Sequence, residues 1–270
     1  MSPRRRLDTE LVRRKLVSSR EEAQRAVEAG LVLVGGAPAL KASRMVAADE
    51  PVTLAGPAAR FVSRGGEKLD AALAHFAVDV AGKRALDAGA STGGFTDCLL
   101  QRGAAHVVAV DVGYGQLHDK LRNDPRVHVL ERTNVRHLRL DVPADVVVAD
   151  LSFISLGTAA PALVGENAKP GADVVLLVKP QFEAGKAETD KGKGVIRDPA
   201  VWRRVLGEVR SALTAHGAAM MDVMVSPLQG ADGNVEFLAH VRAHALSLGP
   251  SSASGAPLVS DARLDAIVER

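Results

Sequence analysis

The chain has 270 residues, of which 47% are hydrophobic and 3% aromatic, and its formal net charge is +2. This length suits one large domain and one small domain, at about 100–200 residues each, and the single cysteine, Cys98, excludes an intrachain disulfide. No run approaches the ~18 apolar residues of a membrane span, and the basic start at residues 4–6 is not followed by the apolar core of a secretory signal. We therefore expect a cytoplasmic protein with no membrane partner.

The positive charge is concentrated near the N-terminus. Residues 1–62 carry 11 Lys or Arg against 7 Asp or Glu, whereas the remainder carries 23 against 25. A basic module on a near-neutral body favours binding of a polyanion. A solvated charged face is the alternative.

The N-terminal module is predicted to hold two short helices and a strand. Asp8 or Thr9 can cap a first helix, and the overlapping capping boxes at residues 18–21 and 19–22 begin a second helix that ends at Gly30. Residues 31–34 have the pattern of a strand. Basic side chains that fall mostly off the apolar faces are predicted to be free to contact phosphates: Arg13, Arg14, Lys15, Arg20 and Arg25.

This module resembles the alpha-L RNA-binding motif of S4-like domains over roughly residues 4–55. The likeness rests on Arg6-Leu-Asp-x-x-Leu11, Ser19-Arg20-x-x-Ala23, Gly30-x-Val32-x-Val34 and Gly36, with Gly35 where these domains usually have Asn. It implies binding to structured RNA through the shape and the phosphates of the RNA. The alternative is that this module is only a small helical cap. The RNA-binding residues that it implies are Arg4, Arg6, Arg14, Arg20 and Lys41.

From residue 83 onward, short apolar strands alternate with helical stretches. This pattern predicts a doubly wound α/β sheet. Strands are expected at residues 84–87, 107–111, 127–130, 145–150, 174–179, 220–225 and 236–241. The expected domains are an α+β S4-like domain at 1–58, a linker at 59–63, a large Rossmann-like α/β domain at 64–246, and a tail at 247–270 with a short helix. The tail is of low complexity at residues 249–257, and the apolar face of its helix is expected to dock on the large domain through Leu264, Ile267 and Val268.

The most informative stretch of the large domain is Asp87-Ala-Gly-Ala-Ser-Thr-Gly-Gly-Phe-Thr96. A strand, a glycine turn and a helix in that order place bare backbone N–H groups at a helix N-terminus. The glycine spacing departs from the G-x-G-x-x-G of dinucleotide sites and favours an adenosyl ligand, S-adenosylmethionine (SAM), over a pyrophosphate. A plain tight turn is the alternative.

Polar residues follow five consecutive predicted strands, at the edge where such sheets bind ligands. Asp111 stands 24 residues after Asp87, near the ~20-residue spacing of an acid that binds ribose hydroxyls; Asp145, at the start of its strand, is expected to be structural. The predicted cofactor-binding residues are Asp87, Gly89, Ser91, Gly93, Gly94, Phe95, Thr96, Asp111, Asn134 and Asp150. No metal site is predicted.

Methylation of a ribose hydroxyl requires a base, because that hydroxyl is a weak acid. Lysine serves if its amine is neutral, which burial and a nearby second cation favour. Lys179 follows a buried strand directly, Lys68 is the candidate second cation, and Glu236 could orient both lysines. Taken singly, Lys68 and Glu236 have the character of surface residues rather than site residues.

Over nearly its whole length the chain resembles the TlyA family of ribosomal RNA methyltransferases, within the larger FtsJ-like group of ribose 2′-O-methyltransferases. The likeness rests on Ser63-Arg64-Gly65-Gly66-x-Lys68-Leu69, the 87–96 stretch, Asp111-Val-Gly-Tyr-Gly-Gln116, Glu131-Arg-Thr-Asn134, Asp150-Leu-Ser-Phe-Ile-Ser155, Lys179-Pro-Gln-Phe-Glu183 and Gly233-Asn-Val-Glu236. Phe61 stands where the family often has Trp.

This resemblance implies SAM-dependent methylation of a cytidine 2′-hydroxyl in 23S rRNA, and in 16S rRNA for members with fuller termini, as here. It gives the catalytic tetrad as Lys68, Asp150, Lys179 and Glu236. In it Lys179 is the base, Lys68 and Glu236 position it, and Asp150 lies between cofactor and substrate. The implied partner is ribosomal RNA in ribosomal subunits; the oligomeric state is left open.

Two loops are expected to frame the RNA, at residues 180–198 and 226–234. The first carries Lys186, Lys191, Lys193 and Arg197 and has the pattern of a phosphate-contacting lid or of a disordered loop. Asp198-Pro199 then begins a helix.

Other functions stay open. Asp150-Leu-Ser-Phe153 faintly resembles the signature of base N-methylases, a non-catalytic RNA-binding factor would need no cofactor, and a membrane-active haemolysin finds no support in the composition.

Overall fold

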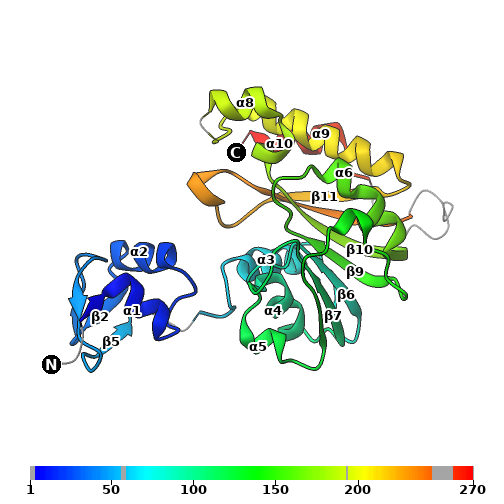
Figure 1. The fold of residues 1–270 in the computed structure, drawn as a ribbon. Coiled ribbons are helices and arrows are strands. Elements are labelled where there is room, and N and C mark those ends of the chain that lie inside the picture. Colours follow the sequence, from blue (N-terminus) through cyan, green and yellow to red (C-terminus); the bar gives the residue numbers. More distant parts are fainter. Residues whose placement is uncertain (1–3, 56–58, 193, 245–257, 270) are drawn as a thin grey trace. The chain divides into compact units, whose positions relative to one another are not determined.

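The N-terminal unit is a small α+β fold. The computed structural model describes residues 4–55, 59–192, 194–244 and 258–269, and it divides the chain into compact units at residues 1–59 and 60–270. A sheet of order β3-β2-β5 and the antiparallel pair β1-β4 enclose a core that includes Leu7, Leu11 and Val27. The elements are β1 (Arg5–Arg6), α1 (Leu7–Arg13), α2 (Arg20–Glu28), β2 (Val32–Val34), β3 (Ala37–Pro38), β4 (Met45–Val46) and β5 (Val52–Leu54) (Figure 1).

The two helices of this unit begin differently. The capping box predicted for α2 is confirmed: Ser19 Oγ accepts the N–H of Glu22 at 3.2 Å, and the Glu22 carboxylate accepts the N–H of Ser18 at 2.7 Å. The cap predicted for α1 is wrong. Arg6 occupies the N-cap without a side-chain bond, and Asp8 lies inside the helix, where its carboxylate accepts the N–H of Thr9 at 2.8 Å and also bonds Arg6 and Arg20.

The C-terminal unit is built on a seven-stranded sheet of order β11-β12-β10-β9-β6-β7-β8. Its strands from β10 to β8 run parallel, and β12 runs antiparallel between β10 and β11. The predicted Rossmann-like fold class is confirmed. The strands are β6 (Arg84–Ala88), β7 (His106–Val110), β8 (Val127–Leu130), β9 (Ala144–Ala149), β10 (Ala168–Val178), β11 (Ala219–Val225) and β12 (Phe237–Arg242).

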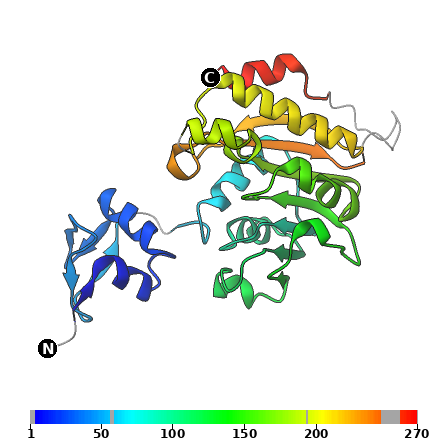
Figure 2. The same cartoon turned by 45° about the horizontal axis from the view of Figure 1, so that its top comes forward.

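Helices cover both faces of this sheet (Figures 1 and 2). On one face lie α3 (Gly65–His75), α4 (Gly94–Gln101) and α5 (Asp119–Arg122); on the other lie α6 (Leu156–Ala160), α9 (Pro199–Ala215) and α10 (Asp261–Val268). Asp198 caps α9 by accepting the N–H of Ala200, as predicted. The tail helix α10 buries Leu264, Ile267 and Val268, which confirms the expected docking strip.

The remaining elements are short. They are η1 (Val135–His137), η2 (Pro161–Glu166), α7 (Pro180–Glu183), α8 (Lys186–Lys191) and η3 (Ala231–Gly233). Residues 180–198, expected to be a loop, thus contain two short helices, because Pro180 begins one and Gly185 separates it from the next. The low-complexity stretch at 249–257, linker residues 56–58 and Lys193 lie outside the described residues. Within the described ranges, no helix is long and apolar enough to cross a membrane.

The strand directions bring the predicted site residues to one edge of the sheet. The loops after β6, β7, β8, β9 and β10 all leave the carboxyl ends of parallel strands. Because β12 runs the opposite way, its first residues lie at this same edge, where Phe237 pairs with Val178. Glu236 therefore comes next to the end of β10 although it precedes its own strand.

Candidate active site

The glycine turn after β6 lies against the end of β9. Gly89 has φ +85°, and a Cβ at this position would lie 2.4 Å from the carbonyl oxygen of Asp150. The N–H groups of Gly89 and Ala90 both donate to the carbonyl of Val110 at the end of β7. Only glycine allows this conformation and this close approach together. The turn is therefore held between the ends of two neighbouring strands.

Asp87 supports the turn from inside the protein. Its side chain is fully buried, Thr96 donates to its Oδ2 at 2.6 Å, and Oδ1 has no hydrogen bond among the described residues. Burial raises the pKa of Asp87 to about 7. Asp87 thus links the end of β6 to the first turn of α4.

Asp111, at the end of β7, joins two loops. Its carboxylate accepts the N–H of Ser91 at 2.8 Å and the N–H of Gly113 at 2.7 Å. Asn134, after β8, accepts the N–H of Arg136 at 3.1 Å and so caps η1. Both side chains face the same cavity.

Two adjoining cavities lie at this edge of the sheet and share Gly89, Ser91 and Asp150. The larger has a volume of about 570 Å³, and the smaller, of about 210 Å³, is also lined by Arg64 and Lys68. Of the predicted cofactor residues, Asp111 and Asn134 line the larger cavity, and Gly94 and Phe95 line the smaller one. Asp87, Gly93 and Thr96 line neither, because they pack behind the turn.

Lys179 is anchored at the mouth of β10. Its Nζ lies 2.5 Å from Asp150 Oδ1 and donates to Ser152 Oγ at 3.0 Å. Only 12% of its side chain is exposed. The two contacts from the loop after β9 direct the amine, and Asp150 brings it to the border of both cavities.

Lys68 and Glu236 form a second lysine–carboxylate pair. Their side chains, on α3 and just before β12, are 10% and 3% exposed and make an ion pair and a hydrogen bond. The alternative that both are surface residues is therefore wrong, because the antiparallel β12 brings Glu236 inward beside α3. Gly230 makes room for the Glu236 carboxylate, since a Cβ there would lie 2.2 Å from Oε1.

Three further side chains belong to this region and were not predicted as site residues. Ser152 bonds Lys179, and Phe153 is 91% exposed, has φ +64° and lies 5.2 Å from the ring of Phe182 between centroids. Glu183 accepts the N–H of Leu156 at 2.8 Å, and burial raises its pKa to about 7. The motifs at 150–155 and 179–183 contain all of them, but no spacing in those motifs distinguishes them from structural residues.

The predicted RNA-binding residues of the N-terminal unit fall into two groups. Arg4, Arg6, Arg20 and Lys41 are exposed. Arg14 is only 19% exposed and donates to Glu10 and to the backbone carbonyls of Ala47, Ala48 and Glu50. The expectation that Arg14 is free to contact phosphates is therefore not met, because its donors are used within the fold.

Comparisons with known proteins agree with both units. Residues 61–243 match the family model for FtsJ-like methyltransferases, and residues 5–52 match that for S4 domains. The chain is 52% identical to the 16S/23S rRNA (cytidine-2'-O)-methyltransferase TlyA of Mycobacterium tuberculosis, over 90% of this chain and 91% of that protein. It is 39% identical to Hemolysin A of Brachyspira hyodysenteriae, over 87% of this chain and 98% of that protein. A solved structure described as a hemolysin from Streptococcus thermophilus aligns with a TM-score of 0.77 and 37% identity, over 100% of this chain and 96% of that one.

Proposed function

The chain belongs to the FtsJ-like methyltransferase family, and from this premise we propose that it transfers a methyl group from SAM to the 2′-hydroxyl of a cytidine in ribosomal RNA, in both the 23S and the 16S molecule. The observation that carries the proposal is the pair of lysine–carboxylate contacts beside two joined cavities. The name of the M. tuberculosis relative supports the nucleotide and both RNAs. Such a protein would work in the cytoplasm, on ribosomal subunits.

The residues that line the cavities support SAM as the methyl donor. The larger one offers carboxylate oxygens of Asp111 and Asp150, which suit ribose hydroxyls and a cationic ligand better than a phosphate. The close approach of Gly89 to the Asp150 carbonyl leaves no room for a side chain, which fits a ligand that lies against the backbone of the turn. Bound there, SAM would supply an activated methyl group on a sulfonium.

In this proposal Lys179 is the base. The amine of Lys179 would take the proton of the 2′-hydroxyl, and Asp150 would stabilise the ammonium that forms. SAM would supply the methyl group: the bond from its carbon to the ribose oxygen would form as the bond to sulfur breaks, and the uncharged thioether S-adenosylhomocysteine would leave. Ser152 orients Nζ through its hydroxyl. Lys68, held by Glu236, lines the smaller cavity and would help to position the substrate there.

RNA binding is assigned to exposed cations and one aromatic ring. Arg4, Arg6, Arg20 and Lys41 of the S4 domain would contact phosphates of structured RNA. The exposed ring of Phe153, at the rim of the larger cavity, offers a surface on which a base can stack.

The proposal is tested by mapping ribose methylation on 50S and 30S subunits treated with the purified protein and labelled SAM. Lys179→Met is expected to lower the rate by about 100-fold or more, the usual contribution of a general base, and to leave SAM binding measurable by calorimetry. Lys169→Met is the matched control, because Lys169 is an exposed lysine that pairs with Asp145 at the start of β9. Label on a base rather than a ribose, or full activity of Lys179→Met, would refute the mechanism.

A further inference from the structure

A buried carboxylate in the N-terminal unit joins two exposed arginines. Asp8 is fully buried, and Arg6 of β1 donates to it through Nε at 3.1 Å and Nη2 at 2.7 Å. Arg20 of α2 donates to it through Nη2 at 3.1 Å. Because both Nη2 groups bond the same oxygen, Oδ2, the guanidinium groups of Arg6 and Arg20 lie next to each other.

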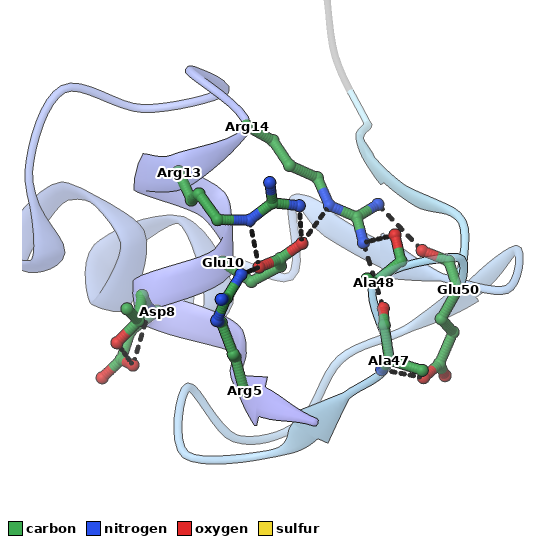
Figure 3. Close-up of polar contacts among 9 residues, drawn as sticks. Arg5, Asp8, Glu10, Arg13, Arg14, Ala47, Ala48 and Glu50 are labelled. Carbon is green, nitrogen blue, oxygen red and sulfur yellow. Dashed lines mark hydrogen bonds and ion pairs between the residues drawn. The ribbon is translucent and has the colours of Figure 1, made fainter. Parts of the chain in front are cut away.

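A second buried carboxylate, Glu10, gathers three arginines in the same way. Arg13 donates to it at 2.8 and 2.6 Å, Arg14 at 2.7 Å, and Arg5 lies 4.0 Å away; Figure 3 shows these side chains converging on it. The Arg13 guanidinium lowers the pKa of Glu10 to about 2, and the Arg6 guanidinium holds the pKa of Asp8 well below its usual range. Both carboxylates are therefore ionised at neutral pH.

The arginines differ in what they leave free. Arg14 gives its remaining donors to the carbonyls of the 47–50 turn (Figure 3) and is largely buried. Three of the others are anchored on one side only, with 46–58% of the side chain exposed: Arg6, Arg13 and Arg20. Within the part of the chain that the structure describes, the Nη1 groups of these three arginines make no hydrogen bond, whereas Nη1 of Arg5 is the atom that lies 4.0 Å from Glu10.

We propose that Asp8 and Glu10 are positioning residues for RNA binding, which hold Arg6, Arg13 and Arg20 in place so that their outward N–H groups bind the phosphates of structured RNA. The inference rests on the proposed function, in that the N-terminal unit binds RNA. Guanidinium groups suit phosphate because their planar donors match its oxygens. An arginine that is ordered beforehand avoids the loss of side-chain freedom on binding, which weakens affinity about two- to twelvefold per side chain.

The test uses a substitution for which charge and positioning predict opposite results. Asp8→Asn removes a negative charge from an RNA-binding surface, so electrostatic attraction alone predicts tighter binding. If Asp8 positions the arginines, Asp8→Asn should weaken RNA binding about tenfold. Binding of the full chain to purified 50S subunits is measured by filter binding at fixed salt. Glu28→Gln is the matched control, because Glu28 is an exposed acid on α2 with no charged partner among the described residues, and it should bind as tightly as the wild type or more tightly. Asp8→Asn binding as tightly as Glu28→Gln would overturn the inference.

A second measurement separates positioning from folding. In a background that carries Arg6→Ala and Arg20→Ala, Asp8→Asn should weaken binding by less than twofold, because the side chains through which it acts are gone. A further tenfold loss in that background would mean that Asp8 only supports the fold, and would overturn the inference. Glu10→Gln in an Arg13→Ala background gives the same comparison for the second carboxylate.

The same variants distinguish this inference from the proposed function. If Arg6→Ala and Arg20→Ala bind 50S subunits as the wild type does, the assignment of these two arginines to RNA binding in the proposed function fails, and the positioning role of Asp8 fails with it. If these two variants bind weakly and Asp8→Asn does not, only the positioning role fails.

Discussion

Gly89→Ala is expected to disable the site through a collision that a matched variant avoids. At φ +85° an alanine is strained by about 1–2 kcal/mol. Its Cβ would also lie 2.4 Å from the carbonyl oxygen of Asp150, where ordinary contact begins at 3.4 Å, so the backbone that carries Asp150 must move by about 1 Å. A displacement of this size at a positioning group costs about 100-fold in rate.

Gly115→Ala supplies the control. Gly115 has φ +70°, and a Cβ there meets no atom within 4 Å, so this variant has the strain without the collision. Both variants should unfold about 2–8 °C below the wild type, given the strain and the size of the C-terminal unit. Only Gly89→Ala should lose about 100-fold in kcat/KM with labelled SAM and ribosomal subunits. Activities of the two variants within threefold of each other would refute the reasoning.

Two further predictions concern buried charge. The pKa of the Asp87 carboxyl is about 7 in the folded protein and 3.8 in the unfolded chain. Protonated Asp87 therefore favours the folded state. Its contribution to the free energy of unfolding is complete below pH 3.8 and is lost as the pH rises through 7. Urea unfolding should therefore show the wild type losing about 4 kcal/mol relative to Asp87→Asn between pH 4 and 8, and parallel pH profiles would contradict this. Glu236→Gln leaves the Lys68 ammonium buried without its carboxylate and should cost about 3–5 kcal/mol of unfolding free energy. The double variant Glu236→Gln with Lys68→Met should recover much of the lost unfolding free energy. If the losses of the two single variants simply add in the double variant, the two side chains do not act as a buried pair.

The sequence predicts the sheet and its polar edge well, because apolar strands, glycine turns and the acids that follow them are local patterns. Asp111 and Lys179 stand at the strand ends where the pattern places them. The burial of Glu236 is not a local property, since it depends on β12 entering the sheet antiparallel, beside a helix 168 residues earlier in the chain.

The N-terminal unit shows the same limit. Asp8 has the local pattern of a helix cap, but Arg20, twelve residues later, competes for its carboxylate together with Arg6. Arg14 has the position of an exposed helix residue, yet the 47–50 turn brings three backbone carbonyls to it. In both cases a partner from another element decides the outcome, and a single stretch of sequence does not contain that partner.

The position of β12 also sets when the buried pair of Lys68 and Glu236 can form during synthesis. This strand is the last of the sheet to be synthesised, yet it lies inside the sheet, between β10 and β11. Chains emerge from the ribosome N-terminus first, so the S4 unit and the strands from β6 to β10 are available before Glu236 and its partner strand have left the exit tunnel. Lys68 gains its carboxylate only after residue 236 has left the tunnel. A nascent chain can thus present a folded S4 unit while this buried pair is still unformed.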